Sequence, residues 1–249
     1  KGDGVAQNLS KAFEWYKQAA EKGNADAMFN LACCFAEGDG VAQDLSKAFE
    51  WWQRAAENGN ADAMVNLACC FQMGYGVARD LSKTFEWWQR AAENGKADAM
   101  VNIACCFDEG RGVARNKSKA FEWFQRAAEK GDTNAMFKLG CYYVRGEGVA
   151  QDIDKAVEWW QRAAENGDVD ATYNLARCFD KDDGGAQDAR KAFEWCQRAA
   201  KSGHAAAMFC VACCFAEGVC VKQDHNKAVE LVKLLLQVGG AEAIKKCLC

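Results

Sequence analysis

The sequence repeats one 36-residue pattern without a gap, and this repetition limits the possible folds more than any other feature. A fixed period of this length is typical of solenoid proteins, in which each unit buries its apolar face against its neighbours. A solenoid offers a long surface and lacks the single deep pocket of most enzymes. The sequence therefore predicts a binding surface. The residues that keep the register are Gly4, Gly40, Gly76, Gly112, Gly148 and Gly184, then Lys11, Lys47, Lys83, Lys119, Lys155, Lys191 and Lys227, then Gly23, Gly59, Gly95, Gly131, Gly167, Gly203 and Gly239.

Composition narrows the class of protein and of partner. Hydrophobic residues make up 50% and charged residues 27% of the chain, which is ordinary for a folded domain and argues against disorder. Proline is absent, as suits helices. The net charge is −4 and there is no basic stripe, so we expect no nucleic-acid partner. No apolar run approaches the ~20 residues of a membrane span, so we expect no membrane-spanning helix.

One repeat, residues 24–59, shows how the pattern folds. Apolar residues at helical spacing predict helix A over about residues 25–37 and helix B after residue 44. Asn24 and Asp44 are the expected N-caps, Gly38 and Gly59 the expected helix ends, and Gly40 a turn residue with positive φ. The fold class predicted from this repeat is all-α.

The paired tryptophans of helix B predict contacts in two directions. Trp51 and Trp52 are successive residues, and successive residues of a helix point about 100° apart. We expect one of them to face helix A of its own repeat and the other to reach a neighbouring repeat. Both have a structural role in this interpretation.

These residues together resemble the Sel1-like repeat, a slightly longer relative of the tetratricopeptide repeat. The resemblance covers essentially the whole chain and implies a right-handed superhelix of antiparallel helix pairs, an adaptor or scaffold role, and no catalysis or cofactor. In the repeat at residues 24–59 it is carried by Ala27, Leu31, Ala32, Phe35, Gly38, Gly40, Val41, Asp44, Lys47, Ala48, Trp51, Trp52, Ala55, Ala56 and Gly59.

The register gives the expected domain boundaries. We expect a single solenoid over residues 1–249, with helix B of a cut first repeat at 7–22. Repeats then begin near residues 24, 60, 96, 132, 168 and 204, and a partial last repeat covers 240–249. We interpret the N-terminus as a cut through a longer array, with Phe13, Trp15 and Tyr16 half uncovered. Neither end has a polar cap, so we expect self-association or membership of a larger complex through these edges.

The chain has 15 cysteines, and their positions differ from those in one branch of the Sel1-like repeat family that this chain resembles. In its secreted, cysteine-rich branch, disulfides link helix B to the next helix A, whereas this chain has Ala55 and Ala56 there. Its adjacent pairs, such as Cys33 and Cys34, lie in the middle of helix A. Equivalent residues of stacked helices lie about 10 Å apart, beyond the ~7 Å that a disulfide spans. We expect no disulfide framework, favour a reducing compartment such as the cytoplasm, and do not transfer the penicillin-binding activity proposed for that branch.

The resemblance also implies where a protein or peptide partner binds, because helix A lines the concave face of tetratricopeptide-like superhelices. One column of that face is apolar throughout, and two neighbouring columns vary between otherwise similar repeats. Arg177 interrupts a cysteine column that consists of Cys33, Cys69, Cys105, Cys141 and Cys213. Partner selection and free drift at solvated positions both explain the variation. The predicted partner-binding residues are Phe29, Val65, Val101, Phe137, Tyr173 and Phe209, with Gln72, Met73, Asp108, Arg145, Arg177 and Lys181.

A third column, Asn30, Asn66, Asn102 and Asn174, permits two interpretations. Related modules use such asparagines with basic residues to hold a peptide carboxylate. Few basic residues accompany them here, so a structural hydrogen-bonding role is the preferred interpretation.

Catalytic and metal sites find little support. The two histidines, His204 and His225, lie outside the cysteine column, so no Cys–His nucleophilic pair is expected. Asp180–Gly185 lacks the terminal Glu of a calcium loop. Cys210, Cys213, Cys214 and Cys220 with either histidine form the one cluster to test for a metal. No catalytic residue, metal or cofactor is therefore predicted. A thiol-based redox or metal-binding protein that uses the cysteine column stays open as the alternative function.

Overall fold

The computed structural model describes residues 8–181 and 186–237. These residues form thirteen α-helices, and no strand occurs among them. The chain divides into two compact units, residues 1–130 and 131–249, which are described separately. The prediction of an all-helical repeat fold is confirmed, while the handedness of the superhelix and the single domain over 1–249 stay predictions.

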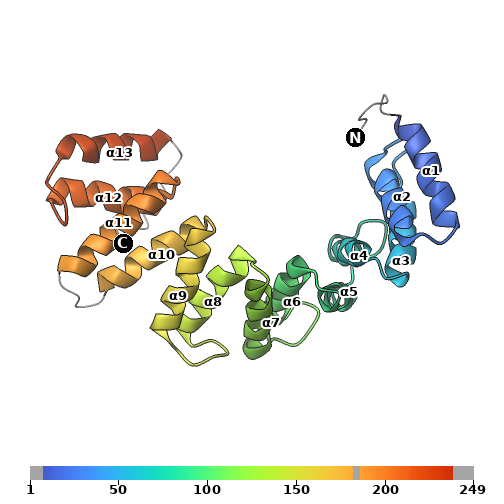
Figure 1. Cartoon of the computed structure of the whole chain (residues 1–249), viewed down its shortest axis with the longest axis horizontal. Coiled ribbons are helices and arrows are strands. Elements are labelled where there is room, and N and C mark those ends of the chain that lie inside the picture. The colour runs from blue at the N-terminus through green and yellow to red at the C-terminus, as the bar shows by residue number, and fades with distance from the viewer. Residues whose placement is uncertain (1–7, 182–185, 238–249) are drawn as a thin grey trace. The chain divides into compact units, whose positions relative to one another are not determined.

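Helix follows helix along the first unit, and sequence neighbours pack together (Figure 1). The helices of this unit are α1 (Leu9–Glu21), α2 (Ala25–Glu37), α3 (Leu45–Glu57), α4 (Ala61–Met73), α5 (Leu81–Glu93), α6 (Ala97–Glu109) and α7 (Lys117–Glu129). In repeat terms, α2, α4 and α6 are A helices and the others are B helices. Each A helix pairs with the B helix that follows it.

The second unit continues the same alternation. Its helices are α8 (Thr133–Arg145), α9 (Ile153–Glu165), α10 (Val169–Lys181), α11 (Ala186–Lys201), α12 (Ala205–Glu217) and α13 (His225–Gln237). Here α8, α10 and α12 are A helices. Helix α11 has 16 residues against 13 in the other helices. It begins three residues ahead of the repeat register, just after the loop whose sequence departs from the repeat.

The predicted caps set the helix ends. The Asn24 side chain accepts a hydrogen bond from the Ala27 amide, and the Asp44 side chain accepts one from the Lys47 amide at 3.0 Å. Gly38 ends α2 in the left-handed conformation, and Gly59 follows α3 with φ of 87°. Each of these predictions is confirmed, because cap chemistry depends on residues a few positions apart.

The loop inside a repeat lies against the preceding repeat. Gly76 has φ of 67°, and a Cβ there would collide with the carbonyl oxygen of Leu45 at the start of α3. Gly112 stands in the same relation to Leu81. This loop glycine therefore provides both the left-handed turn and the close approach between repeats. Cys220 occupies the same repeat position with φ of 60°.

Two aromatic positions of the B helix make the contacts within and between repeats. The second residue of the tryptophan pair faces helix A of its own repeat, where the Trp160 indole Nε1 donates to the Phe137 carbonyl oxygen at 3.1 Å. Between repeats, Phe49 of α3 meets Phe71 of α4 edge to face at 5.4 Å. Trp52 is buried, as expected of a residue that faces its own repeat.

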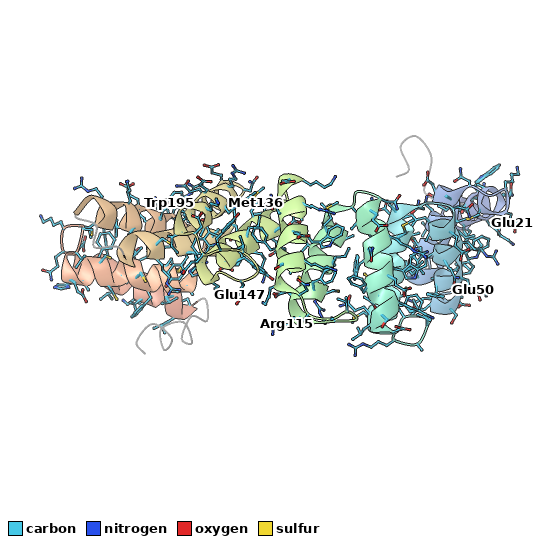
Figure 2. All side chains as sticks on the ribbon, turned by 90° about the horizontal axis from the view of Figure 1, so that it is seen from below. Glu21, Glu50, Arg115, Met136, Glu147 and Trp195 are labelled. Atoms are coloured by element: carbon cyan, nitrogen blue, oxygen red, sulfur yellow. The ribbon has the colours of Figure 1, made fainter. Side chains whose placement is uncertain are left out.

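The first tryptophan of each pair lies nearer the surface. The Arg54 guanidinium stacks over the Trp51 ring at 4.6 Å, and the same stack recurs in the B helices up to Arg198 over Trp195 at 5.2 Å. Figure 2 labels Trp195 on α11. Trp87 lines a cavity together with Phe49 and Gln53 of the preceding B helix, so it lies on the side of the neighbouring repeat. The predicted contact with that repeat stays a prediction.

Candidate functional site

The A helix leaves one face uncovered after it has packed. In α2 the buried residues are Ala27, Met28, Leu31, Ala32, Cys34 and Phe35. Asp26 is exposed, and Phe29, Asn30 and Cys33 are half-buried on the remaining face. The same burial pattern recurs in α4 and α6 because the repeat register is unbroken. We call this uncovered side the A-helix face.

The predicted apolar column lies on the A-helix face of both units. Each of its members is half-buried, so each contributes to packing and still presents part of its surface. Because part of each side chain is exposed, a partner can contact this column while the repeats stay folded. In the first unit it consists of Phe29, Val65 and Val101, and in the second of Phe137, Tyr173 and Phe209.

The residues predicted from the variable columns differ in how much of each side chain is exposed to solvent. Met73 is 59% exposed, and Arg145 and Arg177 are also exposed. Gln72 is half-buried and lines a recess of about 30 Å³, too small for a ligand. The side chain of Lys181 lies outside the described residues. Exposed side chains that contribute little to packing are the ones available to a partner.

Asp108, another predicted variable residue, already has a partner inside the protein. Its carboxylate forms an ion pair with Lys117, which begins α7. Most repeats carry leucine or isoleucine at the position of Lys117. This pair was not predicted, although a lysine at a position that holds leucine or isoleucine in most repeats is a signal for it. Asp108 thus joins the A helix to the start of its B helix.

Two of the four asparagines in the predicted A-helix column, Asn30 and Asn102, have the structural role that was preferred for them. Asn30 Nδ2 donates to the Asp26 carbonyl oxygen at 2.9 Å, and Asn102 Nδ2 donates to the Asp98 carbonyl oxygen at 2.9 Å. Each bond closes one turn of the same helix. A carboxylate clamp would need these amides to point at a ligand, so the clamp interpretation loses support.

Polar side chains link neighbouring A helices at their N-terminal ends. Asn60 Nδ2 donates to Asp26 Oδ1 at 2.9 Å, although 34 residues separate them. Lys96 Nζ lies 2.6 Å from Asp62 Oδ1 in the same relation. These links were not foreseen. Their signal is a cap residue that can donate, placed 34 residues after an aspartate.

In the second unit His204 takes the place of the cap asparagine. Its Nδ1 accepts from the Ala207 amide at 3.1 Å, and its Nε2 lies 3.3 Å from Asp170 Oδ1. The ring stacks on Tyr173 with centroids 4.4 Å apart. His204 is therefore held on both nitrogens as a cap and an inter-repeat link.

Several thiols of the A helices have a raised pKa. Burial raises the pKa of the Cys33 and Cys34 thiols and raises that of Cys70 to about 11. Burial also raises the pKa of Cys141, and the nearby Arg145 only partly opposes the rise. Since the thiolate is the reactive form, a raised pKa slows reaction at neutral pH. Cys33, Cys34 and Cys70 are free thiols.

The remaining sites considered from sequence can be placed in part. Cys213 and His225 line one cavity of about 320 Å³ between α12 and α13. Within the described ranges, no group of three or more His, Cys, Asp or Glu side chains could hold a metal ion. The aspartate-rich loop at Asp182–Gly185 lies outside those ranges. None of the helices in the described residues is long and apolar enough to span a bilayer.

Comparison with known proteins identifies the repeat. The Sel1 repeat family model matches residues 1–24, 25–60, 61–96, 97–132, 133–168, 169–204 and 205–234. A comparison with curated proteins found no match.

Two solved structures have a similar fold. A protective antigen of uropathogenic Escherichia coli with an SLR fold is 30% identical, with a TM-score of 0.86 over 93% of this chain. This chain spans 50% of the antigen's length. A Sel1 repeat protein from Oxalobacter formigenes is 28% identical, with a TM-score of 0.70 over 93% of this chain and 100% of that one.

Proposed function

The chain belongs to the Sel1 repeat family, and from that premise we propose that it is a non-catalytic adaptor that holds a protein or peptide partner on its A-helix faces. Repeats of this family serve in protein–protein interaction. The observation that carries the finer proposal is the half-buried apolar column of each unit, which adjoins exposed residues that differ between repeats. Apolar contact supplies affinity in such a surface, and the variable residues supply selectivity.

The second unit allows the sharper test of this proposal, because its A helices carry two exposed arginines and those of the first unit carry none. Arg145 and Arg177 are exposed on A helices whose equivalents in most other repeats carry an acidic residue or a cysteine. An exposed guanidinium is suited to a carboxylate of a partner. We propose that these two arginines and the column of Phe137, Tyr173 and Phe209 bind the partner together.

The alternative, a thiol-based redox or metal-binding protein, has weaker support. Redox and metal-binding cysteines function as thiolates, and they are usually found in electropositive, partly exposed surroundings. In the predicted column, Cys33, Cys69 and Cys141 are half-buried, and burial raises the pKa of each thiol. A raised pKa leaves less thiolate at neutral pH, which weakens the support for this alternative.

A capture experiment with matched charge changes tests the adaptor proposal. The wild-type chain, Arg177→Ala and Arg145→Glu are each immobilised and exposed to an extract of the source cells. The control is Arg162→Ala, which removes an arginine that stacks on Trp159 of a B helix in the same unit. We expect capture of a partner by the wild type and the control, and at least a severalfold loss with the other two variants. Equal capture by all four proteins would contradict binding at the A-helix face.

A further inference from the structure

A cavity recurs at the same place in successive repeats, between two B helices and the A helix that separates them. One copy lies between α3, α4 and α5 and has a volume of about 310 Å³. A second lies between α5, α6 and α7, with about 350 Å³. In the first copy Trp87 and Arg90 of α5 form one wall, and the guanidinium of Arg90 stacks on the Trp87 ring at 4.7 Å.

The copy between α11, α12 and α13 differs from the other two. It has a volume of about 450 Å³. Leu231 stands where α5 has Trp87, and Leu234 stands where α5 has Arg90. Leu234 is 44% exposed, and Met208 and Phe215 lie behind the two leucines in the cavity wall. The aromatic ring and guanidinium of the repeat are absent, and a larger apolar opening takes their place.

The charged residues are placed differently in the same copy. Glu57 of α3 accepts a hydrogen bond from Gln53 at 3.0 Å, and the next repeats keep this pair. The equivalent residue of α11 is Lys201, which lines the cavity with Lys227 and one acidic group, Glu230. The α3–α5 lining holds Lys83 and Arg90 with Glu86, so both linings have one excess positive charge, but here one of the two cations lies on α11. Two lysines against one glutamate favour an acidic ligand.

We propose that this α11–α13 cavity binds an acidic amphipathic helix of a partner protein, and that an aromatic side chain of the partner fills the place of the missing tryptophan. An aromatic side chain in an apolar pocket is the usual anchor of a protein interface. Acidic residues of the same helix pair with Lys201 and Lys227. The α11–α13 cavity and the A-helix face are different surfaces, so this site goes beyond the proposed function.

Residues 238–249 do not have the chemistry proposed for the occupant. They include no aromatic residue, one glutamate and two lysines.

A synthetic helical peptide with glutamates on its polar face, and leucines and one tryptophan on its apolar face, tests the proposal by fluorescence anisotropy with the full chain. A matched peptide has alanine in place of the tryptophan. We expect the tryptophan peptide to bind about tenfold or more tightly than the alanine peptide. No binding of the tryptophan peptide would overturn the proposal.

Two sets of substitutions locate the site. The double variant Leu231→Trp, Leu234→Arg restores the pair that α3, α5, α7, α9 and α11 carry. It should therefore fold, and it should lose peptide affinity about tenfold. The reciprocal variant Glu57→Lys, Trp87→Leu, Arg90→Leu rewrites the α3–α5 cavity and should create a second binding site for the peptide. Undiminished binding by the first variant, or no second site in the second, would overturn the proposal. Arg177→Ala should leave peptide affinity unchanged, which separates this test from that of the A-helix face.

Discussion

Gly140 of α8 lies directly against the indole ring of Trp160 in α9, so close that a Cβ at residue 140 would collide with Nε1. The other A helices carry alanine at this position. Trp160 uses the added room to donate its indole hydrogen to the Phe137 carbonyl oxygen at 3.1 Å. The glycine is thus a packing requirement of one particular helix pair.

Gly140→Ala is therefore expected to destabilise the second unit, although alanine is the better helix former. Overpacking costs about 1–3 kcal/mol and the gain in helix propensity is about 1 kcal/mol, so we expect a net loss of up to about 2 kcal/mol. Urea unfolding followed by circular dichroism measures it. The double variant Gly140→Ala, Trp160→Phe should recover part of the loss, because the smaller ring relieves the collision. A more stable Gly140→Ala single variant would contradict this account.

Gly76→Ala and Gly59→Ala separate backbone strain from collision. Both glycines have positive φ, 67° and 87°, but a Cβ at Gly59 would meet nothing within 4 Å. Gly59→Ala should cost only the left-handed penalty of about 1–2 kcal/mol. Gly76→Ala adds the collision with the Leu45 carbonyl oxygen and should cost about 2–5 kcal/mol. Similar unfolding midpoints for the two variants would show that the loop does not depend on this close approach.

The helix caps and Gly140 show which features of the fold can be predicted from the sequence and which cannot. Caps and turns such as Asn24, Gly38 and Asp44 were predicted because their chemistry depends on neighbours within four residues. The requirement for Gly140 was not, because it depends on the exact position of a ring 20 residues away in a different helix. Asn60 and Asp26 escaped prediction for the same reason, since each is a common surface residue until the stacking of helices brings them together.

The same distinction between local and long-range features applies to the candidate site. Half-burial of the apolar column follows from helical periodicity, and Phe29 and Val65 are half-buried, while their role in partner binding stays a prediction. Periodicity says nothing about long side chains that turn back on their own repeat. The ion pair of Asp108 with Lys117 was therefore not foreseen, although Asp108 was predicted to contact a partner.

His204 offers a test of the links between A helices. The ring caps α12 through Nδ1 and reaches Asp170 through Nε2. Asparagine does both at Asn60, so His204→Asn should change the free energy of unfolding by less than about 0.5 kcal/mol. His204→Ala removes the cap, the link and the stacking on Tyr173, and should cost about 1–2 kcal/mol. Urea titrations at neutral pH compare the three proteins. Equal losses in both variants would assign the role to the imidazole ring alone.

The buried thiol of Cys70 predicts a loss of stability at alkaline pH. Burial raises the pKa of this thiol to about 11 in the folded chain, whereas an unfolded cysteine has a pKa of about 8.5. Below pH 8.5 both states hold the proton, so the contribution of the thiol to stability is complete. Between about pH 8.5 and 11 the unfolded state releases the proton and the folded state keeps it, so the free energy of unfolding falls as pH rises.

Urea midpoints of the wild type and of Cys70→Ala, measured from pH 7.5 to 10.5, test this linkage. Cys70→Ala should be less stable at pH 7.5, because the buried sulfur loses its packing, but its midpoint should fall less steeply towards pH 10.5. A residual slope is expected in the variant, since burial also raises the pKa of Cys34 and Cys106. Lysines that lose charge near pH 10 affect both proteins alike. Identical slopes would mean that water reaches the Cys70 thiol, and would contradict its burial.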